Sequence, residues 1–271
     1  MRRSAGRVVL AVLVAAGMVA AGTGCAKSDK GGTTKSGVTL VAAGKLTVCT
    51  HLPYEPFQYR NDAGRIVGFD IDLMGLVAKK LGLKQSIVDT PFEGIKSGQD
   101  LNAGKCDVAA AGMTINPERQ KVMDFSDPYF DADQALLVRS GDSYGSLDAL
   151  RGKKLGTQAS TTGEEYANAH ASQAGYHTVS FKDLAALQQA LATRQVDAAI
   201  DDLPVMATYV KHHPGKFTVS TRFKTGEQYG YSVKKGSSRA LLATINSVLA
   251  QAKKDGTYDK IYAKWIGGKP S

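Results

Sequence analysis

The amino-acid sequence predicts an α/β protein built from two lobes of similar architecture. Its 271 residues are 43% hydrophobic and 22% charged, an ordinary globular composition at a length that suits one large or two medium domains. From Lys45 onward, short apolar segments typical of strands alternate with segments of helical spacing. One helix-to-strand junction occurs twice, over residues 101–110 and 191–200, with a Leu and an Asp six positions apart in both. So short a similarity also arises by chance, but combined with the alternation it predicts two lobes.

The N-terminal residues have the pattern of a bacterial export signal. A basic head is followed by an apolar stretch over residues 8–22, which is shorter than the ~18–20 residues of a membrane-spanning helix. A permanent membrane helix is the less favoured alternative. Gly22-Thr23-Gly24-Cys25 resembles a lipobox, although Gly22 replaces the usual Leu, so residues 1–24 are a predicted signal peptide and Cys25 a predicted lipidation site. The alternative is ordinary cleavage nearby, which leaves Cys25 as a free thiol.

The segment after Cys25 predicts a tether rather than folded structure. Residues 25–37 are rich in Gly, Ser, Thr and Lys and lack apolar periodicity. The formal charge of the chain is +9, but Arg2, Arg3 and Arg7 lie in the predicted signal peptide and the other basic residues are scattered. This distribution argues against a nucleic-acid partner.

The first α/β block follows from strand and helix signals after Lys45. Strands are expected over residues 45–50, 86–89 and 107–112, and helices over 70–81 and 94–103. Asp70 is the expected N-cap of the first helix, and Gly82 its end.

The second block has the same kinds of signal. Helices are expected over residues 147–150, 163–171 and 183–193, and strands over 154–158, 178–181 and 196–201. Thr161 and Thr162 each precede a Glu by three positions, which predicts a helix start. A strand over 230–233 and helices over 239–253 and 257–265 complete the chain and are expected to return to the first lobe. Because ligands of open α/β sheets bind beyond the strand ends, the predicted site lies near residues 112–114 and 201–202.

Common catalytic and metal motifs are missing from the sequence. The five His residues have no metal-ligand spacing, and there is no G-x-S-x-G, P-loop or H-E-x-x-H motif, so no metal or cofactor is expected. Cys49 and Cys106 could form a disulfide in an exported protein, or stay as small buried thiols.

Residues 111–119 form the most informative segment. Asn116 can cap a helix, Pro117 suits its first position, and Arg119 falls in its first turn. A cation there opposes the helix dipole, so an anionic ligand shared with free backbone N–H groups would account for it. The alternative is an ion pair with Asp124 or Asp127.

Several segments in order resemble a known family. Residues 54–57, 67–73, 111–119, 124–129 and 255–262 are similar to the polar amino-acid-binding proteins of ABC importers, extracellular solute-binding family 3, over about residues 44–267. The resemblance implies the two-lobed fold of type 2 periplasmic binding proteins. It implies lobe 1 over residues 38–130 and 230–271, lobe 2 over 131–229, and a monomer that delivers an amino acid to a membrane permease.

The resemblance also implies roles for individual residues. Arg119 would bind the ligand α-carboxylate with the Thr114 and Thr162 N–H groups, and Asp202 the α-ammonium with Gly112 and Thr114, although Asp202 alone could be a solvated loop acid. Tyr54 and Phe92 would enclose the ligand side chain, or be plain core residues. The other expected contacts are Met113, Gln158 and Thr161, with Glu93, Asp201 and His51 as possible specificity residues. His51 departs from relatives that have Asp there, which leaves the bound amino acid open.

Two other functions fit the same resemblance. One is a cyclohexadienyl-dehydratase-like enzyme, for which Glu93 or Asp201 would be the acid that expels a hydroxyl group. The other is a sensory amino-acid-binding protein without transport.

Overall fold

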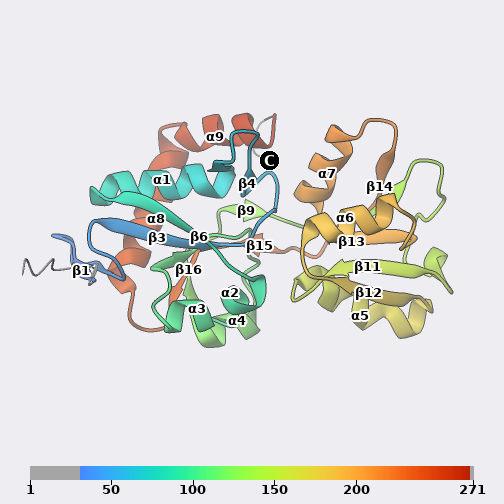
Figure 1. Ribbon diagram of the computed structural model, residues 1–271, viewed down its shortest axis with the longest axis horizontal. Coiled ribbons are helices and arrows are strands. Elements are labelled where there is room, and N and C mark those ends of the chain that lie inside the picture. The colour runs from blue at the N-terminus through green and yellow to red at the C-terminus, as the bar shows by residue number, and fades with distance from the viewer. Residues whose placement is uncertain (1–30, 269–271) are drawn as a thin grey trace, which may run out of the picture.

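Two five-stranded sheets, each flanked by helices, organise residues 31–268, which the computed structural model describes (Figure 1). The strand order is β6-β3-β7-β16-β8 in the first sheet and β12-β11-β13-β10-β14 in the second. Each sheet and its helices form one lobe, and the lobes lie side by side along the long axis (Figure 1). The predicted two-lobed α/β fold is confirmed.

The first lobe combines strands from both ends of the described chain. Its sheet contains β3 (Lys45–Thr50), β6 (Lys84–Asp89), β7 (Val108–Ala109), β8 (Met123–Phe125) and β16 (Ser232–Lys234). β3 is parallel to β6 and β7, whereas β16 is antiparallel to β7 and β8. Helices α1 (Phe69–Leu81), α8 (Arg239–Lys254) and α9 (Thr257–Trp265) lie on one side of the sheet, and α2 (Phe92–Lys96), α3 (Gln99–Asn102) and α4 (Pro117–Val122) on the other (Figure 1).

The second lobe is built from one continuous stretch of chain. Its strands are β10 (Gln134–Arg139), β11 (Lys154–Gln158), β12 (His177–Phe181), β13 (Ala198–Asp202) and β14 (Phe217–Phe223). Its helices are η1 (Asp148–Leu150), α5 (Thr162–Ala174), α6 (Leu184–Ala192) and α7 (Leu203–His212). The parallel strands β11 and β13 end toward the first lobe, which brings their C-terminal residues to the cleft (Figure 1).

Two neighbouring segments join the lobes. β9 (Phe130–Asp131) pairs antiparallel with β15 (Gln228–Tyr229), with Phe130 opposite Tyr229. Paired connections of this kind are typical hinges between domains. Tyr229 also packs edge-to-face against Phe57 at 5.0 Å between ring centroids, so the hinge is anchored in the core of lobe 1.

Short hairpins decorate the first lobe. β1 (Gly32–Thr33) pairs with β2 (Thr39–Leu40), and β4 (Tyr59–Arg60) with β5 (Ile66–Val67). Val38 and Leu40 are buried in the lobe 1 core. The described end of the segment expected to be a tether therefore forms part of a hairpin, while Cys25 and the predicted signal peptide lie outside the described residues.

Asp70 does not cap α1 as the sequence predicts. The N-cap is Gly68, whose φ of +141° and close approach to the Phe57 carbonyl, 2.1 Å from a built Cβ, require glycine. Asp70 is instead fully buried, and its carboxylate accepts hydrogen bonds from the Gly112 N–H at 2.9 Å and the Tyr129 hydroxyl at 2.6 Å.

Two other expected elements are shorter than predicted. The helix expected over residues 94–103 is divided into α2 and α3, because Gly98 between them has a φ of +71°. The strand expected over residues 107–112 reduces to β7, since the chain leaves the sheet toward the cleft, where Gly112 has a φ of +55°.

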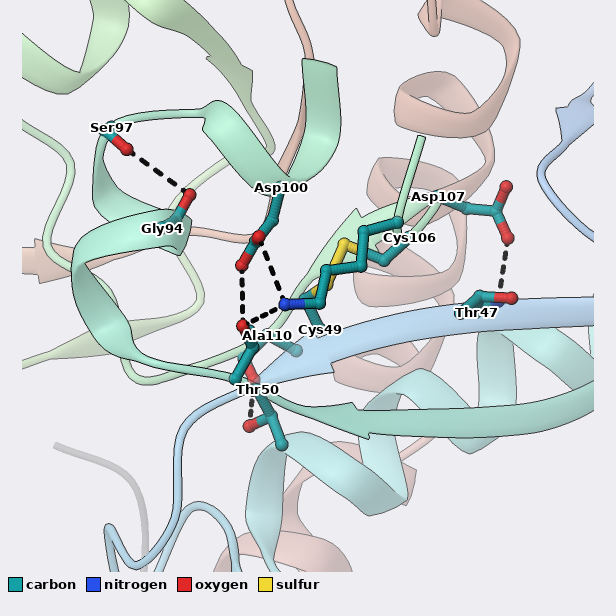
Figure 2. Close-up of a disulfide and its surroundings, with 11 residues drawn as sticks. Thr47, Cys49, Thr50, Gly94, Ser97, Asp100, Cys106, Asp107 and Ala110 are labelled. Atoms are coloured by element: carbon teal, nitrogen blue, oxygen red, sulfur yellow. Dashed lines mark hydrogen bonds and ion pairs between the residues drawn. A yellow bond between two sulfur atoms is a disulfide. The ribbon is translucent and has the colours of Figure 1, made fainter. Parts of the chain in front are cut away.

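Cys49 and Cys106 form a disulfide (Figure 2). It links β3 to the turn before β7, and both residues are buried. Figure 2 shows Asp107 beside it, whose carboxylate accepts from the Thr47 N–H at 2.7 Å. The disulfide therefore ties together two strands that lead to the cleft.

Candidate functional site

A cavity with about 320 Å³ of empty volume lies between the two lobes. Ten of the predicted site residues line it: His51, Tyr54, Phe92, Gly112, Thr114, Arg119, Gln158, Thr161, Thr162 and Asp202. The loop after β3, the start of α4 and the ends of β11 and β13 bring them together.

Arg119 provides a buried positive charge at the cavity. It is 4% exposed, and α4 begins as predicted, with the Asn116 side chain accepting from the Arg119 N–H at 2.9 Å. The guanidinium donates to the Thr114 carbonyl at 2.8 Å and the Ser160 carbonyl at 3.4 Å. These bonds use only part of its five N–H donors, so it can still bind a carboxylate with two parallel bonds.

Arg119 has no acidic partner within ion-pair distance in residues 31–268. Asp124, one of the two alternatives, pairs with Lys235 at 3.0 Å. Burial lowers the pKa of the Arg119 guanidinium, because the charged form loses hydration. A buried cation in this setting calls for an external anion.

The N-terminus of α5 supplies further affinity for an anion. Thr161 caps the helix by accepting from the Glu164 N–H at 3.1 Å, and Thr162 is its first residue. The first backbone N–H groups of a helix lack acceptors within it, and the helix dipole favours negative charge there. The Thr114 and Thr162 hydroxyls lie 3.4 Å apart, so the two lobes meet at this end of the cavity.

Acidic residues gather on the lobe 2 side. Asp202 is 5% exposed at the end of β13, and its carboxylate accepts from the Tyr54 hydroxyl at 2.7 Å. It also accepts from the Tyr229 hydroxyl and the Gln134 amide. Burial, followed by repulsion from Asp201, raises the pKa of Asp202. A ligand ammonium group would relieve both effects.

Aromatic and polar groups form the rest of the wall. Tyr54 and Phe92 both line the cavity, and Arg119 lies over the Phe92 ring at 5.4 Å from its centroid. His51 Nδ1 lies 3.0 Å from the Thr90 carbonyl, which can only accept, so Nδ1 carries a proton and donates to it. No partner within residues 31–268 reaches His51 Nε2, Gln58 Oε1 or Gln158 Oε1, although all three atoms are buried.

Three predicted residues do not line the cavity. Met113 packs in the core beneath it, and Glu93 bonds to Ser160 at the rim. Asp201 Oδ1 lies 2.8 Å from the Tyr54 hydroxyl, whose one hydrogen it shares with Asp202, and it is not among the lining residues. Neither of the two carboxylates considered for the acid role in the dehydratase hypothesis is thus among the residues that line the cavity.

Three residues at or beside the cavity were not expected from the sequence, Gln58, Ala111 and Gln134. Gln58 and Ala111 line the cavity, and Gln134 donates to Glu227 at 2.7 Å as well as to Asp202. Ala111 could have been predicted as a lining residue, because it directly precedes Gly112 in the sequence. No sequence signal marks Gln58 or Gln134, because both reach the site through contacts between distant parts of the chain.

Residues 31–268 contain neither a cluster of metal-binding side chains nor a helix suited to span a membrane. They hold no group of three or more His, Cys, Asp or Glu side chains arranged to bind a metal. None of their helices combines the length and apolar character required to cross a membrane.

Known proteins resemble the chain over most of its length. The family model of bacterial extracellular solute-binding proteins, family 3, matches residues 46–268. A probable histidine-binding protein of Neisseria gonorrhoeae is 32% identical over 223 residues, which is 81% of this chain and 82% of the relative. The putative ABC transporter arginine-binding protein 2 of Escherichia coli (strain K12) is 30% identical over 235 residues, which is 84% of this chain and 93% of the relative. The solved structure of an ancestral arginine-binding protein bound to arginine has a TM-score of 0.78 and 44% sequence identity, and the match covers 83% of this chain and 99% of that protein.

Proposed function

Because the chain belongs to family 3 of the bacterial extracellular solute-binding proteins, we propose that it captures L-arginine for an ABC importer. The family and the relatives make it an extracytoplasmic protein that binds a polar amino acid in an ABC transport system. Arginine as the ligand, and the roles of individual residues, are the finer proposal.

The observation that carries the proposal is the pairing of opposite charges in one cavity. Arg119 comes from α4 of lobe 1 and Asp202 from β13 of lobe 2, and both line the same small space. An α-amino acid presents a carboxylate and an ammonium group a few bonds apart. Arg119 with the α5 N-terminus would bind the carboxylate, and Asp202 the ammonium.

The unpartnered acceptors favour a ligand side chain rich in N–H groups. Gln58 Oε1 and Gln158 Oε1 are buried at the cavity, where an unmet acceptor costs free energy, and His51 Nε2 is also buried there without a partner within residues 31–268. A guanidinium has five N–H donors and a flat apolar face that stacks on aromatic rings such as Tyr54 and Phe92. The names of the relatives, which include arginine-binding proteins, support the same ligand.

Calorimetry with modified ligands tests the proposal. L-arginine should bind more tightly than lysine, histidine or glutamine. Agmatine lacks the carboxylate and N-acetyl-arginine lacks the ammonium, so each should bind at least about a hundredfold more weakly, since each leaves one buried charge unpaired. Agmatine affinity close to that of arginine would overturn the role of Arg119, and stronger binding of another amino acid would overturn the choice of ligand.

We also propose that lipid on Cys25 anchors a monomer to the cell membrane, where it delivers ligand to the permease. The lipobox-like residues 22–25 support this anchor. Cys25→Ala should move the protein from the membrane fraction to the soluble extracytoplasmic fraction. An unchanged distribution would contradict the anchor.

The proposed role requires no chemistry on the ligand. Incubation of the protein with prephenate or arogenate should therefore give neither phenylpyruvate nor phenylalanine above the spontaneous rate. Enzymatic formation of either product would revive the dehydratase hypothesis.

A further inference from the structure

We propose that Ser160 and Glu93 form a clasp across the cleft that sets how slowly the bound amino acid dissociates. Neither residue lines the cavity. The inference rests on the proposed function, because it concerns the closed state that holds the ligand. It assigns to this pair a positioning role.

Ser160 has an unusual backbone conformation for a residue with a side chain. Its φ is +71°, and within residues 31–268 only Arg194 shares a positive φ among non-glycine residues. Arg194 lies in the turn after α6, whereas Ser160 lies between β11 and the N-cap of α5. The Ser160 N–H donates to Glu164 Oε2 at 2.7 Å, which holds this left-handed conformation in place. Strained residues fixed in this way are often part of a functional device.

This conformation directs two polar groups of Ser160 toward the other lobe. Its hydroxyl donates to the Glu93 carboxylate, and its carbonyl accepts from Arg119 Nη2 at 3.4 Å. Glu93 lies in the first turn of α2, and Lys96 Nζ is 3.7 Å from the same carboxylate. Ser160 belongs to lobe 2, while Glu93 and Arg119 belong to lobe 1. Both bonds therefore exist only while the lobes are closed.

A contact made only in the closed state slows opening but hardly affects the first encounter with ligand. The Glu93 side chain is 65% exposed, so water competes for its hydrogen bond. Removing the hydroxyl should therefore raise the dissociation rate about three- to tenfold, within the usual range for one hydrogen bond, and change the association rate less than about twofold.

Ser160→Gly is the most informative single change. Glycine adopts a φ of +71° freely, so it removes the hydroxyl and preserves the loop. Glu93→Ala removes the acceptor. Glu118→Ala is a matched control, since Glu118 also lies in the first turn of a short lobe 1 helix and pairs with a lysine three residues later, Lys121, at 2.6 Å.

The test is a double-mutant cycle with L-arginine as the probe. Stopped-flow kinetics and calorimetry should show faster dissociation for Ser160→Gly and for Glu93→Ala, with no further increase when they are combined. The control should match wild type. Additive effects of the two changes, or a wild-type dissociation rate in Ser160→Gly, would overturn the clasp.

A second readout separates the clasp from the choice of ligand. Absence of arginine binding by the wild-type protein would count against the proposed function. Hydrogen exchange in the presence of whichever amino acid raises the melting temperature of the wild-type protein most then still tests the clasp, because that ligand closes the lobes. Amides of residues 156–165 should exchange faster in Ser160→Gly and Glu93→Ala than in Glu118→Ala, and equal exchange in all three would overturn it.

Discussion

Replacing Arg119 with methionine separates ligand binding from fold stability. Methionine retains most of the length and can pack against Phe92, but it removes the positive charge and the hydrogen bonds to the Thr114 and Ser160 carbonyls. Loss of one partner of a buried charge pair costs about 2–5 kcal/mol, which predicts arginine affinity reduced about 30- to 5,000-fold.

The stability of the free protein should change far less. Burial already lowers the pKa of Arg119, which means that keeping its charge buried costs free energy. Removing the charge recovers this cost and partly offsets the loss of the hydrogen bonds. We expect the free energy of unfolding to change by less than about 1.5 kcal/mol. Calorimetry with L-arginine and thermal unfolding without it measure the two quantities separately.

Arg139 offers a matched control in the second lobe. It is also buried, at 9% exposure, but it donates to the Leu191 and Val196 carbonyls at 2.9 Å and pairs with Asp142 at 2.8 Å. Arg139→Met should lower stability and leave arginine affinity unchanged. Arginine binding by Arg119→Met within fivefold of wild type would refute the carboxylate role of Arg119.

Three other perturbations test separate parts of the site. Burial and the Asp201 charge raise the pKa of Asp202 to about 8, and an ammonium ligand requires the ionised form of this carboxyl group. Titration calorimetry should therefore show arginine affinity falling from pH 8 to pH 5, by at most about tenfold per pH unit. A flat profile would count against the Asp202 contact. Gly112→Ala places a Cβ 2.9 Å from the Tyr54 ring, at a residue whose φ is +55°. This change should weaken arginine binding at least about tenfold, because it displaces Tyr54 and adds backbone strain of about 1–2 kcal/mol. Wild-type affinity would show that the ring need not move. Replacing both Cys49 and Cys106 with alanine removes a crosslink between residues 57 positions apart in the sequence. Denaturant titrations should show the free energy of unfolding lowered by about 2–4 kcal/mol. An unchanged free energy of unfolding would show that the disulfide does not stabilise the fold.

The charge-bearing core of the site could be predicted because its signals are local. Asn116, Pro117 and Arg119 stand within one helix start, and the structure shows the expected cap. Thr161 likewise caps α5 through its Glu164 N–H bond. Signals of this kind depend on spacing along the chain, which the sequence displays directly.

The supporting contacts could not be predicted because they join distant segments. Asp70 reads as a helix cap, yet it holds the Gly112 N–H across 42 positions of sequence. Gln134 reaches Asp202 across 68 positions. Ser160 gives no local hint of a positive φ, because serine rarely adopts one, and its N–H bond to Glu164 stabilises that conformation.

The same two charges that bind the ligand also explain why closure should depend on it. Closing the cleft buries Arg119 and Asp202, and burial disfavours the charged form of both side chains. It therefore lowers the pKa of Arg119 and raises the pKa of Asp202. A closed cleft without counter-charges is therefore costly, whereas a zwitterion supplies both at once. A ligand favours closure only by its difference in affinity for the closed and open states. A molecule with one of the two charges leaves the other protein charge buried and unpaired, so the site should select whole amino acids before it discriminates between their side chains.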